Sequence, residues 1–294
     1  MFIFGLKSNK IKTVLCLFAF ICVGRVWTQS PEVFCTNEDR EIFNRIVLEL
    51  DPLPSYPIGR TMVATGRTFL DTPYVPGTLE VGSPERLVVN FRGMDCTTFV
   101  ENVLAFSRMV QVGRKDWDAY LAELEQLRYR DGDLRGYASR LHYFTDWIQN
   151  NAQKGLLEDV TKRIGGVLRD RRINFMGTHP DLYPALASEE ELRSIKQVED
   201  SLSARAFYLV PQHSVRSQEY LIEEGDIIAL ATSIPGLDVT HTGIALRKDN
   251  GRIYLLHAST QGKVMVSEEP LADYLEGINS NVGILVVRPL EPDS

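Results

Sequence analysis

The hydrophobic periodicity of this chain changes near residue 205. Before that position apolar residues recur at helical spacing, and after it they gather in short runs typical of strands. The expected helices span residues 37–51, 60–70, 96–110, 115–129, 137–155 and 188–202. The expected strands span residues 86–91, 206–211, 225–230, 239–246, 252–259 and 282–290. Helices followed by an antiparallel sheet predict an α+β domain.

The N-terminal segment has the pattern of a secretory signal peptide. Three lysines precede an 11-residue apolar run from Val14 to Gly24, and "VWTQS" offers a cleavage point after Thr28. The run is shorter than the ~20 residues that span a bilayer as a helix. We therefore expect residues 1–28 to be removed and residues 29–294 to form a single domain without stable membrane insertion. An uncleaved membrane anchor is the alternative.

The balance of charges excludes one class of partner. Removal of residues 1–28 takes away four of the 32 basic residues and none of the 39 acidic residues, which leaves a formal charge of −11. Nucleic acids and anionic membrane surfaces bind basic protein faces. The chain is therefore expected to bind no nucleic acid and no membrane surface.

Only two cysteines, Cys35 and Cys96, remain after residue 28. They form neither a disulfide framework nor a zinc spacing, so no metal or cofactor is expected. Asp95 is placed to cap a helix that begins at Cys96, and the unpaired N–H groups and dipole of a helix N-terminus favour a thiolate. Cys96 is therefore a candidate nucleophile. The alternative is a small core residue, because Cys96 shares a helical face with Phe99 and Val103.

Two histidines in successive strands are candidates for the base that a thiol nucleophile needs. His241 lies in "DVTHTGIAL" and His257 in "IYLLHAST", and "RKDNGR" joins the two strands. A two-residue Asn250-Gly251 turn places the histidines on opposite faces of the sheet. A three-residue loop with a left-handed Gly251 pairs Gly243 with His257 and places both histidines on one face. A Cys–His–His relay requires the three-residue loop; otherwise each histidine only satisfies a local hydrogen bond.

The expected helix over residues 137–155 carries three candidate substrate-binding residues, Arg140, His142 and Tyr143. One interpretation is that this helix lines a substrate cleft, with Arg140 and His142 offering polar contacts. The alternative is an aromatic core face, because Tyr137 and Trp147 lie close by on the same helix.

Four stretches resemble, in order, the motifs of the NlpC family of papain-like cell-wall hydrolases. They are "DTPYVPG", "GMDCTTF", "THTGIAL" and "LLHAS", where that family has G-x-P-Y, D-C-S-G, H-V-G-I-Y and I-H-A. The strand "EGDIIAL" is also similar to the family's P-G-D-L-V. The close resemblance covers about residues 37–290.

The resemblance implies a papain-like fold of the NlpC type, in which N-terminal helices pack on an antiparallel sheet or barrel. It implies that Cys96 is the nucleophile, His241 the general base and His257 the residue that orients the base. Tyr74 and Thr97 are implied to lie at the substrate.

The chain departs from the usual family in two ways. "DCTTF" replaces "DCSGL", and 145 residues separate Cys96 from His241, far more than a typical NlpC domain has. This combination resembles the N-acetylmuramoyl-L-alanine amidase-like branch, which is found in Gram-negative bacteria. The branch implies a large helical insertion over about residues 112–205 and cleavage, without a metal, of the amide between N-acetylmuramic acid and L-alanine in peptidoglycan fragments. A periplasmic location follows from the resemblance and the signal peptide together.

Two other functions stay open. A γ-D-glutamyl-diamino acid endopeptidase would use the same three residues to cut the peptide of peptidoglycan at another bond. An inactive muropeptide-binding module would instead have Cys96 joined to Cys35 in a disulfide.

Overall fold

The computed structural model of the chain describes residues 32–51 and 56–292. The expected signal peptide, residues 1–28, lies outside the described residues. Within the described part of the chain, no helix has both the length and the apolar character needed to cross a membrane.

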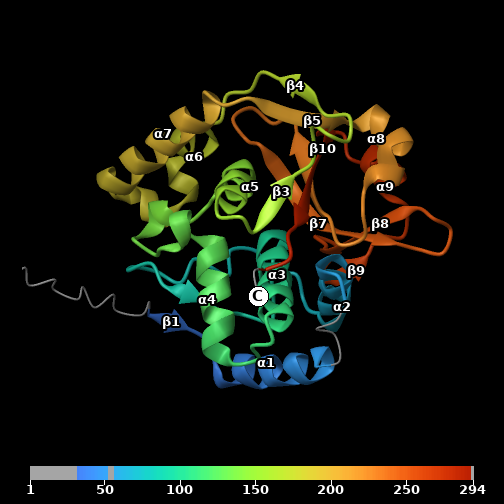
Figure 1. Cartoon of the computed structure of the whole chain (residues 1–294). Helices are drawn as coiled ribbons and strands as arrows, with labels where there is room; N and C mark the ends of the chain where they lie inside the picture. Colours follow the sequence, from blue (N-terminus) through green and yellow to red (C-terminus); the bar gives the residue numbers. More distant parts are fainter. Residues whose placement is uncertain (1–31, 52–55, 293–294) are drawn as a thin grey trace, which may run out of the picture. The chain divides into compact units, whose positions relative to one another are not determined.

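An antiparallel sheet organises the described residues (Figure 1). The strands are β1 Val33–Phe34, β2 Leu87–Val88, β3 Leu157–Asp159, β4 Val167–Arg169, β5 Phe207–Pro211, β6 Ile227–Thr232, β7 Val239–Arg247, β8 Ile253–Ala258, β9 Val264–Val266 and β10 Asn281–Pro289. The sheet has the order β4-β5-β10-β6-β7-β8-β9, with β3 paired to β10, whereas β1 and β2 form a separate parallel pair. The predicted α+β class with an antiparallel sheet is confirmed, although the strand expected over residues 86–91 is only two residues long and lies outside this sheet.

Helices cover both faces of the sheet (Figure 1). They are α1 Asn37–Leu50, α2 Ile58–Thr68, α3 Cys96–Gln111, α4 Trp117–Arg128, α5 Phe144–Gln153, α6 Phe175–Thr178, α7 Glu189–Ser203, α8 Gln212–Gln218 and α9 Leu271–Glu276. Along β7, Ile244 and Leu246 pack into a core shared with α1–α4, whereas Ala245 packs into a second core with α8 and α9. This alternation follows from the two-residue period of a strand.

Helix α3 forms the centre of the first core. Every residue from Thr98 to Val110 is buried. The helix contacts α2 and α4 as well as β7 and β8. A helix enclosed on all sides is apolar around most of its circumference, and this one is held with its N-terminus beside the sheet.

The prediction of a helix over residues 137–155 is wrong for its first residues. Tyr137–Ser139 form a single 3-10 turn, and α5 begins only at Phe144. The backbone is extended at Arg140 and at Tyr143, because their side chains find polar partners on different elements. Tertiary hydrogen bonds and ion pairs here outweigh the local helical pattern.

The segment between α3 and β7 has a small hydrophobic cluster of its own, formed by Tyr137, Tyr143, Ile173, Met176, Leu186, Ile195 and Leu202. Asp238, just before β7, joins this segment to the sheet. Its carboxylate accepts hydrogen bonds from the N–H and the hydroxyl of Thr145 at 2.7 and 2.8 Å. Thr145 lies in the first turn of α5, which has no side-chain cap of its own. Asp238 therefore satisfies the helix N-terminus from another element.

Candidate active site

Cys96 occupies the first position of α3. The Asp95 carboxylate accepts a hydrogen bond from the N–H of Thr98 at 2.8 Å, and the N–H of Asp95 donates to the Thr98 hydroxyl at 3.0 Å. This capping box fixes the direction in which the chain enters the helix. The predicted cap is confirmed, and the backbone N–H of Cys96 is one of the N–H groups that have no partner within the helix.

A short extended segment holds Tyr74 near Cys96. The N–H of Tyr74 donates to the carbonyl of Gly262 at 2.8 Å, and the N–H of Val75 donates to the carbonyl of Met94 at 3.1 Å. Tyr74 thus lies between the residues that precede Cys96 and the loop that follows β8. Burial raises the pKa of the Tyr74 phenol, and the charge of Cys96 raises it further, as expected for neighbours.

The loop between β7 and β8 determines which face each histidine occupies. The N–H of Lys248 donates to the carbonyl of Arg252 at 3.1 Å, and Gly251 between them has a φ of 77°. In this register Gly243 lies opposite His257, because a Cβ built on Gly243 would be 2.8 Å from the Cβ of His257. The three-residue loop is confirmed, and both histidines share one face of the sheet.

His241 and His257 contact each other on that face. Nε2 of His241 lies 2.5 Å from Nδ1 of His257, with the ring planes at 79°. Nδ1 is then the His241 nitrogen left to take a proton from a thiol. For Nδ1 to accept that proton, Nε2 must carry the ring hydrogen and donate it to Nδ1 of His257. Such a hydrogen bond would fix the tautomer and the orientation of the His241 ring, as the predicted role of His257 requires.

The surroundings of Cys96 keep its thiol protonated. Burial raises the pKa of the thiol to about 12, and the charge of Asp95 contributes to the rise. The N–H of Thr242, which follows His241, and the hydroxyl and N–H of Thr97 point at the sulfur and lower the pKa by less. The thiolate expected from the helix N-terminus is therefore not the resting state, because burial outweighs the favourable N–H groups.

Thr242 places the sulfur next to the backbone of β7 at His241. Across the described residues, the hydrogen bonds include none from the sulfur to an imidazole. The direct contact between Cys96 and His241 stays a prediction.

Both imidazoles are neutral at physiological pH. Burial lowers the pKa of His241 to about 4. Burial and, to a smaller extent, the charge of His241 lower the pKa of His257 to about 3. A neutral His241 is able to accept a proton, so the protonation states of thiol and imidazole suit proton transfer during attack rather than a preformed ion pair.

Acidification is expected to destabilise the fold through these imidazoles. Their pKa values are about 4 and 3 in the folded protein, against 6.5 for an ordinary histidine. Between pH 6.5 and about 4 the unfolded chain therefore binds more protons than the folded protein. The free energy of unfolding falls as the pH drops through this range. Urea titrations at several pH values measure this fall. The variant His257→Gln removes one of the two groups and should flatten it; an identical pH dependence in the variant would contradict the assignment.

Arg140, predicted to bind substrate, is instead part of a buried ion-pair cluster. Its guanidinium pairs with Glu80 and lies 3.5 Å from Glu85. It also lies over the ring of Tyr137, 4.8 Å from the centroid. With 5% of its surface exposed, Arg140 serves the packing of this segment.

His142 and Tyr143 also make internal contacts. Nε2 of His142 lies 2.8 Å from the carbonyl oxygen of Tyr137. The hydroxyl of Tyr143 donates to Glu199 at 2.7 Å and accepts from the N–H of Met176 at 2.8 Å. The structure therefore does not bring these two side chains to Cys96, and the aromatic-core alternative describes them better.

Tyr274 is a residue of the site that the sequence interpretation missed. It lies in α9, and its ring is 5.5 Å from that of His257, with the planes at 85°. Burial raises the pKa of its phenol, and the charge of Cys96 raises it further. The stretch "LADYLE" carries no motif, so only the tertiary structure places Tyr274 here.

Neither a disulfide nor a metal cluster occurs at this site within residues 32–51 and 56–292. Cys35 and Cys96 are both free thiols, which overturns the disulfide required by the inactive binding module. No group of three or more His, Cys, Asp or Glu side chains in the same ranges is placed to hold a metal ion.

Comparisons with known proteins place this arrangement in a family. The sequence model of the N-acetylmuramoyl-L-alanine amidase-like family matches residues 64–284. A crystal structure of an N-acetylmuramoyl-L-alanine amidase from Bacteroides uniformis is 41% identical, with a TM-score of 0.75, and the match covers 79% of this chain and 98% of that one. A structure of a proposed xylanase from Bacteroides fragilis is also 41% identical, with a TM-score of 0.71 over 76% of this chain and 98% of that one.

A more distant structure shows the fold alone. It comes from Legionella pneumophila and is 20% identical, with a TM-score of 0.66 over 86% of this chain and 95% of that one. None of the curated proteins compared with the chain matches it. The family match begins before Tyr74 and ends within β10, so it includes Cys96, His241 and His257. The chain therefore belongs to the N-acetylmuramoyl-L-alanine amidase-like family of peptidoglycan hydrolases.

Proposed function

We propose that this protein cleaves the amide between N-acetylmuramic acid and L-alanine in peptidoglycan fragments, with Cys96 as nucleophile. The observation that carries the proposal is the contact between Nε2 of His241 and Nδ1 of His257. Thr242, the residue after His241 in β7, lies against the Cys96 sulfur. Family membership supplies the substrate class, and this group of side chains supplies the chemistry.

In the proposed reaction the Cys96 sulfur attacks the carbonyl carbon of the lactyl amide while Nδ1 of His241 takes the thiol proton. The N–H of Cys96, at the first position of α3, donates to the oxyanion that forms. Collapse of the tetrahedral intermediate breaks the C–N bond, and His241 returns the proton to the amino group of L-alanine. Water, deprotonated by His241, then attacks the thioester carbonyl; the C–S bond breaks, and His241 returns the proton to the Cys96 sulfur, which releases the lactyl carboxylate. His257 holds the His241 ring throughout by accepting its Nε2–H.

The proposal extends to the architecture and the location. Helix α3 with Cys96 at its start, packed on antiparallel strands that carry two histidines, supports a papain-like fold of the NlpC type. The separate hydrophobic cluster between α3 and β7 supports an insertion over about residues 112–205. Residues 1–28 as a signal peptide, and the periplasm of a Gram-negative bacterium as the location, rest on the sequence pattern.

The side chains at the site favour an amidase over a glycosidase. A glycosidase is the function that the name of the Bacteroides fragilis relative suggests. Glycoside hydrolysis uses a pair of carboxyl groups flanking the sugar bond, whereas a thiol and two imidazoles suit acyl transfer. The Bacteroides uniformis relative is named an N-acetylmuramoyl-L-alanine amidase. This name favours the lactyl amide as the cleaved bond over the γ-D-glutamyl bond that an endopeptidase would cut.

Mass spectrometry of the products tests the proposal. A purified disaccharide-tripeptide is incubated with the protein, and we expect free disaccharide and an intact peptide that begins with L-alanine. A disaccharide-dipeptide would establish the endopeptidase instead. An uncleaved substrate, or reducing sugar released from xylan, would contradict the amidase.

A further inference from the structure

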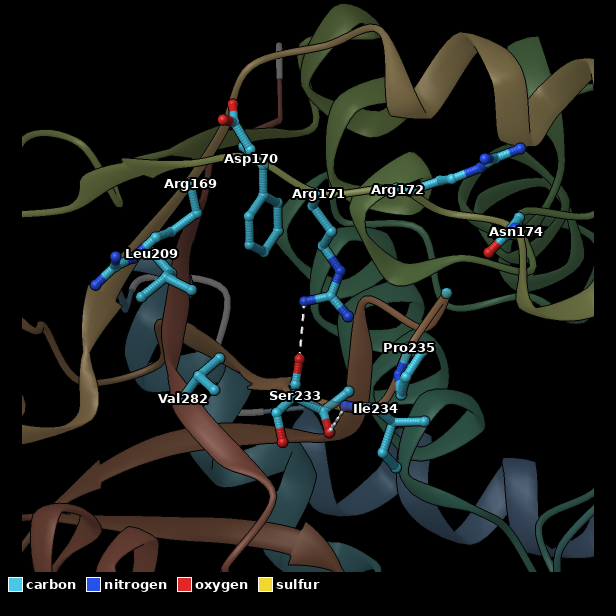
Figure 2. A pocket seen from close by; sticks show the side chains of 13 residues that line it. Arg169, Asp170, Arg171, Arg172, Asn174, Leu209, Ser233, Ile234, Pro235 and Val282 are labelled. Atoms are coloured by element: carbon cyan, nitrogen blue, oxygen red, sulfur yellow. Dashed lines mark hydrogen bonds between the residues drawn. The ribbon is translucent and has the colours of Figure 1, made fainter.

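A cavity of about 700 Å³ lies outside the group formed by Cys96, His241 and His257. Figure 2 shows its walls, which come from the segment 169–174, from β5, from the end of β6 with the residues that follow it, and from the start of β10. Its volume is in the range of pockets that hold small molecules or short peptides. The reaction proposed above does not use its side chains.

The charge of the cavity is opposite to that of the chain. The segment 169–174 contributes Arg169, Arg171 and Arg172 against one acidic residue, Asp170, while the whole chain carries a formal charge of −7. No ion pair among the described residues involves any of these four side chains. In Figure 2 the Asp170 carboxylate points away from the Arg171 guanidinium. The buried carboxylate of Asp238 lies near Arg171 and offsets part of its charge. In Figure 2 the side chains of Arg169 and Arg172 point away from the Arg171 guanidinium. The cavity wall still carries more positive than negative side chains, and Arg171 is the one that faces the apolar walls.

Arg171 is held in place by one hydrogen bond and has further N–H donors unused. Its Nη1 donates to the carbonyl of Thr232 at 2.9 Å, and its guanidinium lies 5.3 Å from the ring centroid of Phe207. Its Nε is buried and has no hydrogen-bond partner. That Nε is not exposed to the cavity, so a ligand there would bind Nη2, which makes no hydrogen bond within the part of the chain that the structure describes. A guanidinium fixed in this way suits a carboxylate, which accepts two parallel hydrogen bonds.

Apolar side chains form the remaining walls. They come from Leu209, Ile234, Pro235 and Val282. A purely ionic ligand would leave these walls in contact with water. The combination of an arginine and apolar walls fits a carboxylate carried on a peptide rather than a free inorganic anion.

The register of β6 and β7 gives the spacing between this cavity and the base. Leu230 pairs with His241, and Thr232, which binds Arg171, follows Leu230 by two residues. From the rise along a strand and the distance between strands, the backbones of Thr232 and His241 are about 8–10 Å apart. Two or three extended peptide residues span about 7–11 Å.

We propose that Arg171 binds a free carboxylate of the substrate peptide, two or three residues beyond the scissile amide. The inference rests on the proposed function, because the position of the carboxylate is counted from the amide that is cleaved at Cys96. It makes the cavity a specificity subsite that distinguishes peptides with a free carboxylate at that place from peptides in which the carboxylate is amidated.

Kinetics with two substrates test the subsite. The substrates are the γ-methylamides of N-acetylmuramoyl-L-alanyl-D-glutamate and of its D-isoglutamine counterpart, which differ only in the α-carboxylate and carry no other carboxylate on that residue. For wild-type protein we expect the acid to have a kcat/KM about 10- to 100-fold above that of the amide, the range of one hydrogen bond to a charged group. Arg171→Met should remove this preference, mainly through KM, and leave the amide substrate unchanged. Arg171→Lys should restore part of it.

The control variant is Arg193→Met, which removes an exposed arginine of α7 outside the cavity. It should keep the preference for the acid substrate. An equal loss with both substrates in Arg171→Met would mean that Arg171 only supports the fold, and would overturn the subsite. So would equal rates with both substrates in the wild-type protein.

A binding experiment separates failure of the subsite from failure of the proposed function. Calorimetry with the γ-methylamides of L-alanyl-D-glutamate and L-alanyl-D-isoglutamine uses wild-type protein and Arg171→Met, and needs no turnover. Tighter binding of the acid that is lost in Arg171→Met supports the subsite even if neither muropeptide is cleaved. Equal binding of the two dipeptides overturns it even if the amidase is active.

Discussion

Replacing Cys96 by alanine is expected to lower kcat/KM for muropeptide cleavage by roughly 10⁴- to 10⁶-fold, the scale measured when a nucleophile is removed from a hydrolase. The alanine cannot form the thioester, and the other thiol in the described part of the chain, Cys35, belongs to the border of the hydrophobic core. Rates with a purified disaccharide-tripeptide, followed by chromatography, measure the loss.

The same variant should fold normally. Cys96 makes no disulfide, and the cap that starts α3 is provided by Asp95 and Thr98. We expect the free energy of unfolding to change by less than about 1 kcal/mol. Cys35→Ala is the matched control, because it removes the other described thiol and should keep full activity. Wild-type rates in Cys96→Ala would exclude the thiol mechanism.

Gly243→Ala is expected to have the second largest effect, because a single methyl group would disturb the histidine pair. A Cβ at this position would lie 2.8 Å from the Cβ of His257 and 2.8 Å from Cδ1 of Leu255. Both distances are too short for carbon atoms, so His257 or the backbone must move. A displacement of about 1 Å lowers kcat/KM by about 10²-fold, and overpacking of this kind destabilises the fold by about 1–3 kcal/mol.

Steady-state rates and urea unfolding, measured on the same preparation, separate the two effects. Gly277→Ala is the matched control. Gly277 has a φ of −74°. A Cβ added to Gly277 would have the carbonyl oxygen of Tyr274, at 3.5 Å, as its nearest contact, so the methyl group fits. If Gly243→Ala keeps the wild-type kcat/KM, the close approach of His257 to β7 is not required for the reaction.

The elements that depend on local sequence were predictable. The cap at Asp95 and the helix that follows it are set by neighbouring residues. The loop after β7 was reduced to two alternatives, and the pairing of Lys248 with Arg252 shows the one that brings His241 and His257 to the same face. A one-residue change of register moves every side chain to the other face, so this small feature had a large consequence.

The features that depend on distant partners were not predictable. Arg140 and Tyr143 read as one face of a helix, yet each is drawn to a carboxylate on another element. Tyr274 reaches His257 from a six-residue helix without any motif. The protonation of Cys96 was misjudged for a related reason, because the sequence shows the helix N-terminus but not the burial that outweighs it.

The enclosure of α3 has a consequence for the order in which the chain can assemble. The helix that carries Cys96 is covered by α2, which precedes it, and by β7 and β8, which are synthesised more than 125 residues later. During synthesis the apolar face that meets the sheet has nothing to cover it until those strands emerge. Cys96 is therefore encoded early but positioned late, and a chain that ends before β8 would lack His257 beside His241 even though Cys96 is present. Contacts this far apart in sequence also slow folding.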